Sequence, residues 1–290
     1  IKMKWGQIKT IFIISFLIVN IFLFQQFLDK FNRANYETIA QQTTFEENLN
    51  ADEITIGDLP ERGRKEAYIS ARRYQFSVDD IEALGERVES QNIYLTEEGE
   101  MIFGEFVNPI PLDLNDQLDQ SIENLKTQIL FGNEYIFWDY YENENVLLFF
   151  QEQEGHTVYF NEAGLLIVIL NEENEAMYYG QTLLTGITPQ SEEETVIDPM
   201  NAVEVLYNSN SLFQKDHISN MRLGYHTLVP LEGGLQVFAP TWEINVNDER
   251  TYFVNAMEGQ MIPYNETDFI ENMKNFIERE IERLDGSEEE

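Results

Sequence analysis

The apolar run Ile11–Phe24 constrains this chain more than any other feature, because 12 of its 14 residues are apolar and only Ser15 and Asn20 are polar. Counted from residue 8 to residue 27, the stretch holds 20 residues, and a helix of that length reaches about 30 Å, one hydrocarbon core. Signal peptidases cleave after small residues, whereas the residues that follow this run are large or charged. We therefore expect an uncleaved membrane anchor, with a cleaved signal peptide and a buried soluble helix as the alternatives.

The charges around the run predict its orientation. Lys2, Lys4 and Lys9 precede it, and no acidic residue occurs before Asp29, so the N-terminus should be cytoplasmic and the rest of the chain extracytoplasmic. All 53 acidic residues follow the run, and the net charge of −35 disfavours binding to nucleic-acid phosphates. Such acidity suits a salty or alkaline medium, although compositional drift explains it equally well.

Asn20 lies in the middle of the run, on one helical stripe with Ile13, Phe16, Phe24 and Phe27. An amide in hydrocarbon is unfavourable without a hydrogen-bond partner, which a second helix would supply. We therefore predict that Phe16, Asn20 and Phe24 contact a partner in the membrane. The alternative is that Asn20 bonds to its own backbone.

Composition and turn signals divide the chain further. Residues 1–28 form the cytoplasmic N-terminus and anchor, and the polar residues 29–60 are typical of an extracytoplasmic stalk. Residues 61–188 and 196–266 each show helical periodicity followed by short β-branched or aromatic runs, with a boundary at Pro189–Thr195. Residues 267–290 form an acidic C-terminal helix and tail. The predicted fold class is α+β, a single transmembrane helix followed by two helix-plus-antiparallel-sheet units.

The elements within these units are predicted from caps, periodicity and turns. Ser77 can cap a helix over residues 78–88, Asp116 precedes helical spacing over residues 118–129, and Asp198 with Pro199 begins a third helix. Predicted strands in the first unit are Tyr135–Tyr141, Val146–Gln151, Thr157–Phe160, Leu165–Leu170 and Ala176–Leu184. Their connections are too short for parallel crossovers, so we expect an antiparallel meander. Predicted strands in the second unit are Met221–Val229, Gly234–Ala239, Thr241–Val246 and Thr251–Ala256, with a hairpin at Asn247–Arg250.

Catalytic signatures are absent from the sequence. The chain has no cysteine, which excludes disulfides, thiolate metal sites and cysteine nucleophiles, and it contains no phosphate-binding glycine loop, nucleophile elbow or zinc-protease motif. His156, His217 and His226 lack the spacing that places two metal ligands on one helix face. We predict no catalytic, cofactor-binding or metal-ligating residue and no enzyme activity.

Two residue groups could still bind a partner. Arg62, Arg64, Lys65, Arg72 and Arg73 place five positive charges within 12 residues, which could bind an acidic partner or an anionic wall polymer, or could simply offset neighbouring carboxylates. Aromatic residues could line a ligand groove, although sheet core is their more common role. These are Trp138, Tyr140, Tyr141, Tyr178, Tyr179 and Trp242. The apolar face over residues 268–284 predicts a helix that docks on the fold or binds a partner.

Both ends of the chain resemble a known family. The segment Met3–Leu23, beginning Met-Lys-Trp-Gly-Gln-Ile-Lys, resembles the start of the YycI family, membrane-anchored regulators encoded with the WalK–WalR (YycG–YycF) two-component system of low-GC Gram-positive bacteria. Ala239–Ile244, Tyr252–Ala256 and Gly259-Gln260 resemble the closing Pro-x-Trp and Val-Asn-Ala-x-x-Gly hairpin of that family, which PepSY-like domains share loosely. The resemblance covers about residues 3–265 and implies an extracytoplasmic α+β protein that partners a YycH-like protein and the sensor kinase WalK.

The resemblance and the anchor together predict a non-enzymatic, membrane-anchored regulator of a WalK-type histidine kinase. It would act with a YycH-like partner and so control cell-wall homeostasis; a homodimer and a heterodimer are both open. No cofactor is expected. The alternative is an anchored PepSY-like protease inhibitor or a module that binds cell-wall fragments. The sign of regulation and the stimulus stay open.

Overall fold

The structure is a computed structural model that describes residues 45–85, 91–153, 155–230 and 234–287; before residue 45 it describes only residues 9, 13, 16, 17, 19, 20, 23 and 24. Contacts divide the chain into two compact units. The first comprises Ile1–Thr55 with Phe213–His217, and the second comprises Ile56–Leu212 with Ile218–Glu290.

The described part of the first unit is a short helix joined to a later loop. Residues 45–51 are helical, and the helix ends at Glu53, whose φ of 57° turns the chain so that the amide of Ile54 donates to the carbonyl of Leu49 (2.9 Å). The amide of Thr55 then donates to the carbonyl of Asp216 (2.9 Å), and the Thr55 hydroxyl lies 2.8 Å from Nδ1 of His217. Part of the polar segment predicted as a stalk is therefore helical.

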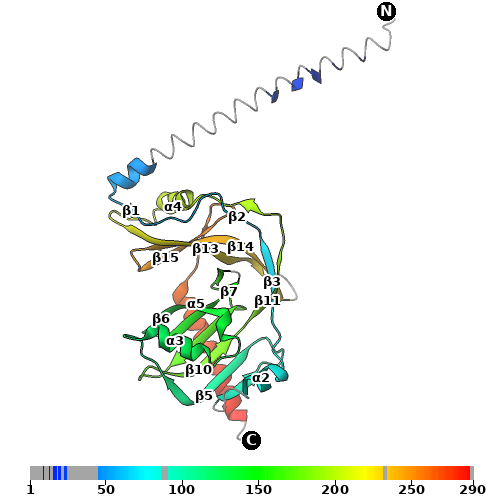
Figure 1. Cartoon of the computed structure of the whole chain (residues 1–290), viewed down its shortest axis with the longest axis vertical. Coiled ribbons are helices and arrows are strands. Elements are labelled where there is room, and N and C mark those ends of the chain that lie inside the picture. Colours follow the sequence, from blue (N-terminus) through cyan, green and yellow to red (C-terminus); the bar gives the residue numbers. More distant parts are fainter. Residues whose placement is uncertain are drawn as a thin grey trace, which may run out of the picture. The chain divides into compact units, whose positions relative to one another are not determined.

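The second unit contains an antiparallel sheet, here called sheet I, with strand order β6-β7-β9-β10-β5-β4 (Figure 1). Its strands are β4 (Gln91–Leu95), β5 (Ile102–Pro111), β6 (Tyr135–Tyr141), β7 (Val146–Gln153), β9 (Leu165–Leu170) and β10 (Glu175–Gln181). The first five residues of β7 and all of β9 are continuous apolar runs, which is typical of strands covered on both faces.

Helices cover the two faces of sheet I (Figure 1). Leu147, Phe149, Leu166 and Val168 pack in one core with α3 (Leu118–Lys126), whereas the alternate residues of β7 and β9 pack in another core with α5 (Glu266–Ser287). The apolar stripe of α5 is therefore docked on the sheet, with Ile270, Ile277 and Ile281 buried. A further helix, α2 (Val78–Gly85), begins at Ser77, whose amide donates to the Asp80 carboxylate (2.8 Å) as in a capping box.

A second sheet, here called sheet II, is built around β13 (His217–Pro230) and β14 (Leu235–Val246). At its other edge, the first part of β14 pairs with β3 (Ile69–Arg73), and β3 in turn pairs with β11 (Leu184–Pro189). The later part of β14 pairs with β15 (Arg250–Asn255), and β15 in turn pairs with β16 (Met261–Ile262). The helix α4 (Pro199–Asn208) lies over one face, where the buried Trp242 indole donates to the carbonyl of Ile197 (3.0 Å). Short strands complete the set: β1 (Thr55–Ile56), and the ribbon of β2 (Lys65–Glu66) with β12 (Glu194–Thr195).

The strand β8 (His156–Tyr159) joins the two sheets. Thr157 pairs with β7 of sheet I, whereas Val158 and Tyr159 pair in parallel with Tyr225 and His226 of β13. The predicted meander is therefore wrong at this strand: β7 pairs directly with β9, and β8 leaves for sheet II. A four-residue strand between two turns carries no local signal for its partner, because pairing is decided by distant residues.

Pro240 does not interrupt β14, contrary to the predicted break between residues 239 and 241. It lies between Phe238, the last residue paired with β3, and Thr241, the first paired with β15, so the missing amide removes no ladder hydrogen bond on that side. The predicted hairpin is confirmed, since Asn247 and Asp248 have φ values of 59° and 55°, as in the turns that suit the twist of hairpin strands.

The described fold is thus mixed α+β with a large, mostly antiparallel sheet system. Sequence patterns predicted β6, β9 and β15 closely, began β13 four residues late, divided β14 at Pro240, and missed β3, β4, β5 and β11. Two of these, β3 and β11, come from the first predicted unit but pair in sheet II.

Candidate functional site

The face of sheet II opposite α4 carries an ion pair between a buried glutamate and a half-exposed arginine. Arg222 of β13 and Glu243 of β14 are direct cross-strand partners, so their side chains share one face. Arg222 donates from Nε to Oε2 (3.1 Å) and from Nη2 to Oε1 (3.0 Å) of Glu243, which is only 3% exposed. Burial disfavours the charge on Arg222, but the hydrogen bonds and charge of Glu243 outweigh burial and raise the pKa of Arg222 above its ordinary value.

Tyr159 of β8 completes this site from the strand that joins the sheets. Its hydroxyl donates to Oε2 of Glu243 (2.9 Å), and burial, followed by the charge of Glu243, raises the pKa of Tyr159 well above its ordinary value. Gly224 provides the space for the ring, because a Cβ at that position would lie 2.5 Å from the ring of Tyr159 and 2.5 Å from the carbonyl oxygen of Thr157. The site therefore holds a neutral phenol, a carboxylate and a guanidinium in fixed positions.

An aromatic cluster surrounds the Tyr159 ring where the two sheets meet. Phe253 of β15 lies 4.9 Å from Tyr159 and 4.9 Å from Tyr264, measured between ring centroids. Phe160 lies 4.8 Å from Phe150 of sheet I, and Trp138 lies 5.7 Å from Tyr159. Edge-on and tilted pairs of this kind each add about 0.5–1.5 kcal/mol beyond the area that they bury.

His226 borders the same cluster, with its ring centroid 5.9 Å from that of Phe253. Its Nδ1 lies 3.2 Å from the carbonyl oxygen of Thr227, which can only accept, so Nδ1 carries the proton in the neutral ring. Nε2 is buried and has no hydrogen-bond partner among the described residues. Burial lowers the pKa of His226, and the bond to Thr227 opposes that shift only in part.

The lowered pKa predicts a pH dependence of stability. A histidine that is harder to protonate when folded adds stability above its unfolded pKa of about 6.5 and loses it as the pH falls toward the folded pKa. We expect the free energy of unfolding of the wild type to fall as the pH is lowered from 7.5 to 5.5. This fall should exceed the fall in His226→Phe by up to about 1.4 kcal/mol per pH unit. Urea unfolding at both pH values checks this, and equal losses in the two proteins would contradict it.

Glu266, at the first turn of α5, anchors the helix to sheet I. Its Oε1 accepts hydrogen bonds from Nε1 of Trp138 (3.3 Å) and from the hydroxyl of Tyr141. Burial, together with the Glu266 carboxylate, raises the pKa of Tyr141 above its ordinary value, so the phenol stays protonated as the donor. A carboxylate is also favourable at a helix N-terminus.

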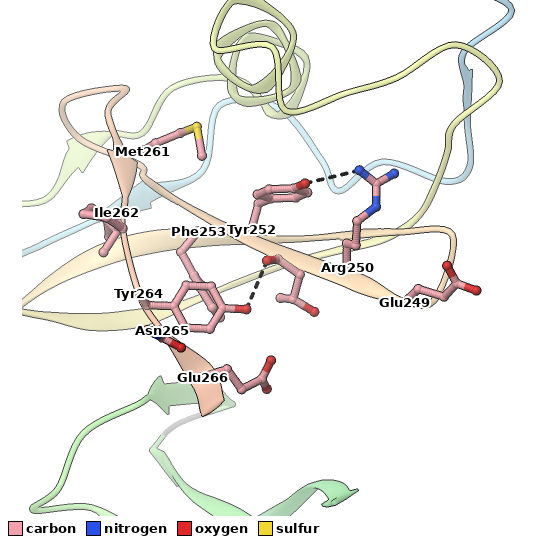
Figure 2. Close-up of a pocket in the computed structure, with 11 residues that line it drawn as sticks. Glu249, Arg250, Tyr252, Phe253, Met261, Ile262, Tyr264, Asn265 and Glu266 are labelled. Atoms are coloured by element: carbon pink, nitrogen blue, oxygen red, sulfur yellow. Dashed lines mark hydrogen bonds between the residues drawn. The ribbon is translucent and has the colours of Figure 1, made fainter. Parts of the chain in front are cut away.

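A groove of about 390 Å³ lies beside this anchor, between β15 and the segment that leads from β16 into α5 (Figure 2). Tyr252, Tyr264, Met261 and Ile262 supply its apolar surface, and Glu249 and Glu266 supply carboxylates. The hydroxyl of Tyr264 donates to the carbonyl of Thr251 (3.1 Å). Arg250 donates from Nη1 to the carbonyl of Ser211 and to the hydroxyl of Tyr252 (3.3 Å each), so internal bonds hold its guanidinium.

A second cavity of about 370 Å³ lies near β3 and β11, lined in part by Tyr74, Phe131 and Gln151. Phe131 has a φ of 51°, which is strained for a bulky side chain, and its ring packs edge-on against that of Tyr74 at 5.7 Å. The buried Gln151 amide bonds both the amide (2.7 Å) and the carbonyl (2.9 Å) of Leu184.

The predicted membrane contacts lie in the sparsely described part of the chain. Phe16, Asn20 and Phe24 are helical, and both phenylalanines are exposed. The Asn20 side chain donates from Nδ2 to the carbonyl of Phe16 (2.9 Å). One of its two amide hydrogens is therefore bonded to the backbone of its own helix, as the alternative to a partner helix had it. Most of the predicted span lies outside the described residues, and none of the described helices is long and apolar enough to cross a bilayer.

The basic cluster is spread along the chain. Arg64 pairs with Glu66 (3.8 Å) and Arg73 pairs with Glu100 (3.4 Å), which fits the charge-offsetting alternative for these two. Arg62, Lys65 and Arg72 are exposed and form no ion pair with other described residues. Lys65 belongs to the ribbon of β2 and β12, whereas Arg72 belongs to β3 of sheet II, so the five basic residues do not share one element.

The aromatic residues singled out belong to the packed cores, with Trp242 and Tyr179 fully buried. Within the described residues, no group of three or more His, Asp or Glu side chains is arranged to hold a metal ion. The site of Tyr159, Arg222 and Glu243 was missed; the one signal for it in the sequence is that Glu243 is the only charged residue of β14.

Comparisons with known proteins point to one family. The family model described as YycI protein matches residues 34–257. No curated protein sequence matches the chain. Among solved structures, an uncharacterized protein from Eubacterium rectale ATCC 33656 has a TM-score of 0.43 at 10% identity, covering 73% of this chain and 89% of the other.

Two further structures have low TM-scores as well. The C-terminal domain of Bacillus megaterium YpeB has a TM-score of 0.36 at 11% identity, covering 76% of this chain and 94% of the other. YycH from Bacillus subtilis has a TM-score of 0.37 at 12% identity, covering 72% of this chain and 57% of YycH. Superpositions this loose carry no functional argument, whereas the family match spans well over half of the sequence. The chain belongs to the YycI family.

Proposed function

We propose that this chain is a membrane-anchored extracytoplasmic regulator that modulates a WalK-type sensor histidine kinase together with a YycH-like protein, and so controls cell-wall homeostasis. The family match over residues 34–257 carries the proposal. Membership in the YycI family implies a regulatory role associated with WalK and YycH, and proteins of this family are membrane-anchored and generally non-catalytic.

The proposal assigns residues 1–28 to a cytoplasmic N-terminus and single membrane span, and residues 29–60 to a stalk. Residues 61–188 and 196–266 form two helix-plus-antiparallel-sheet units, followed by the acidic helix and tail of residues 267–290. The apolar run Ile11–Phe24 supports the span, and the lysines before it support the orientation. The pairing of α3 with sheet I and of α4 with sheet II supports two units.

Co-purification tests the proposal directly. The full-length protein, tagged at its N-terminus, is expressed in a Gram-positive host and crosslinked, and the proteins that accompany it in the membrane fraction are identified. Recovery of a YycH-like protein and a WalK-type kinase, lost when residues 3–28 are exchanged for an unrelated anchor, is the expected result. Recovery of a wall enzyme in their place, or of a cleaved soluble product, would favour the inhibitor or wall-fragment alternative.

Asn20→Leu is expected to weaken recovery of the kinase or of the YycH-like partner about 3- to 30-fold, because an interhelical polar contact contributes roughly 0.6–2 kcal/mol. The bond from Asn20 to the Phe16 carbonyl uses one amide hydrogen and leaves the second hydrogen and the carbonyl oxygen for a partner. Ser15→Leu is the matched control, since it removes the other polar residue of the run from a different helix face. Equal recovery with both variants would refute a role for Asn20.

A further inference from the structure

One edge of β15 is only partly paired. The amide of Ala256 donates to Pro240 of β14 (2.8 Å), whereas the amide of Asn255 donates to Gln260 on the other side (2.8 Å). Because backbone groups alternate along a strand, Thr251, Phe253 and Asn255 direct theirs away from β14. The outer ladder then runs through the Asn255–Gln260 and Phe253–Ile262 pairs, and its next rung would join Thr251 to Tyr264.

That rung does not form. The chain turns away from β15 after Pro263, toward α5, so Tyr264 does not continue the ladder. The Tyr264 hydroxyl takes the place of a backbone donor and satisfies the carbonyl of Thr251 (3.1 Å). No hydrogen-bond acceptor faces the amide of Thr251 among the described residues. An extended backbone is the natural partner for such an edge.

The groove beside this edge has the chemistry to select a basic side chain. Figure 2 shows β15 passing between Tyr252 and Tyr264, with Glu249 beyond Arg250 and Glu266 at the start of α5. Both tyrosine hydroxyls are bonded internally, so their rings offer surface for the methylenes of a lysine and for cation–π contact. Glu249 is exposed and supplies a carboxylate beside the first residue of β15.

We propose that this groove binds an extended, basic peptide segment that adds to β15 as a short strand. A backbone carbonyl of the segment accepts from the open amide of Thr251, and a Lys or Arg side chain lies along one of the tyrosine rings toward Glu249. The volume of about 390 Å³ suits a few residues of such a segment. This peptide site does not depend on whether the chain acts on a kinase.

The test uses the full-length protein in detergent micelles and a fluorescein-labelled octapeptide of alternating Lys and Val. We expect saturable binding at low salt and slowed hydrogen exchange over residues 249–252. Two further octapeptides carry N-methyl groups on alternate residues. One is methylated on the odd-numbered residues and the other on the even-numbered residues. In strand addition only one set of methyl groups points at β15, where it holds the backbone of the segment away from the amide of Thr251. That peptide should lose at least about tenfold in affinity, while the other binds like the parent.

Protein variants test the charge. Glu249→Gln should weaken binding several-fold, and the matched change Glu97→Gln, at an exposed carboxylate outside the groove, should not. An octapeptide of Glu and Val should not bind. Absence of saturable binding, or equal affinity for the two N-methylated peptides, would overturn the proposal. So would protection of residues 249–252 that depends on protein concentration alone, because the occupant would then be a second copy.

Discussion

Arg222→Ala is expected to lower the free energy of unfolding by about 2–4 kcal/mol, because it leaves the carboxylate of Glu243 buried without its cation. Glu243 is 3% exposed, and two of its hydrogen bonds come from Arg222. Only the bond from Tyr159 (2.9 Å) would remain. The side chain of Arg222 is itself about half exposed, so water can partly replace it, and the loss should fall in the lower part of the range for broken buried pairs.

Arg283→Ala is the matched control for this prediction. Arg283 also pairs with a glutamate, Glu280 (2.7 Å), but on the exposed surface of α5, where such a pair contributes about 0.5 kcal/mol or less. Urea unfolding of the full-length protein in detergent, followed by tryptophan fluorescence, compares the two variants. Similar losses in both would show that burial of Glu243 adds nothing to the pair.

A double variant separates the two causes of that loss. Replacing Arg222 with Met and Glu243 with Leu removes the buried charge together with its partner, and such replacements are often close to neutral. We therefore expect the double variant to be more stable than Arg222→Ala. The reverse order would mean that the packing of the arginine stem, rather than the unpaired charge, dominates.

Gly224→Ala is expected to destabilise the protein by about 2–4 kcal/mol through overpacking. The added Cβ would lie 2.5 Å from the carbonyl oxygen of Thr157, a backbone atom that no side-chain rotation can move. Parallel pairing of β8 with β13 at Val158 and Tyr159 leaves little freedom for the two strands to separate. The Tyr159 ring must also move, which breaks its bond to Glu243.

Gly63→Ala provides the control for Gly224→Ala. A Cβ at Gly63 meets nothing within 4 Å, so only its φ of +72° opposes the change, at about 1 kcal/mol. Thermal unfolding measures both variants, and hydrogen exchange over β8 and β13 locates the damage. Losses of equal size would show that the junction accommodates the methyl group. Because Gly224 and Arg222 share Tyr159 and Glu243, their effects should not be additive.

Local patterns predicted much of the fold. The helical spacing of Ile122 and Leu125 and the apolar stripe of α5 identify elements whose buried faces are set by their own periodicity. The turn at Asn247–Asp248 and the first helical turn at Pro199 are set by residues with restricted or unusual backbone preferences. The two family-like ends were sufficient to indicate YycI, which the match over residues 34–257 confirms.

Strand pairing was predicted less well, for a physical reason. β3 and β4 are short strands without clear alternation, and β5 ends in Asn-Pro-Ile-Pro, so none has a strong local signal. Each is stabilised by a distant partner, as when Phe238 of β14 pairs with Ile69 of β3. Propensity in a strand mostly reflects such neighbours, which a local window of sequence does not contain.

By itself, the sequence determined the family, the candidate membrane span, the acidic surface and the positions of the periodic helices and hairpins, because each is encoded in neighbouring residues. Only the tertiary structure decided that β8 would leave sheet I for β13. It also placed Tyr159 against Glu243, 84 residues further along the chain, and left the amide of Thr251 facing a groove. These features arise from packing and from where a strand pair ends, which depend on contacts between residues far apart in sequence.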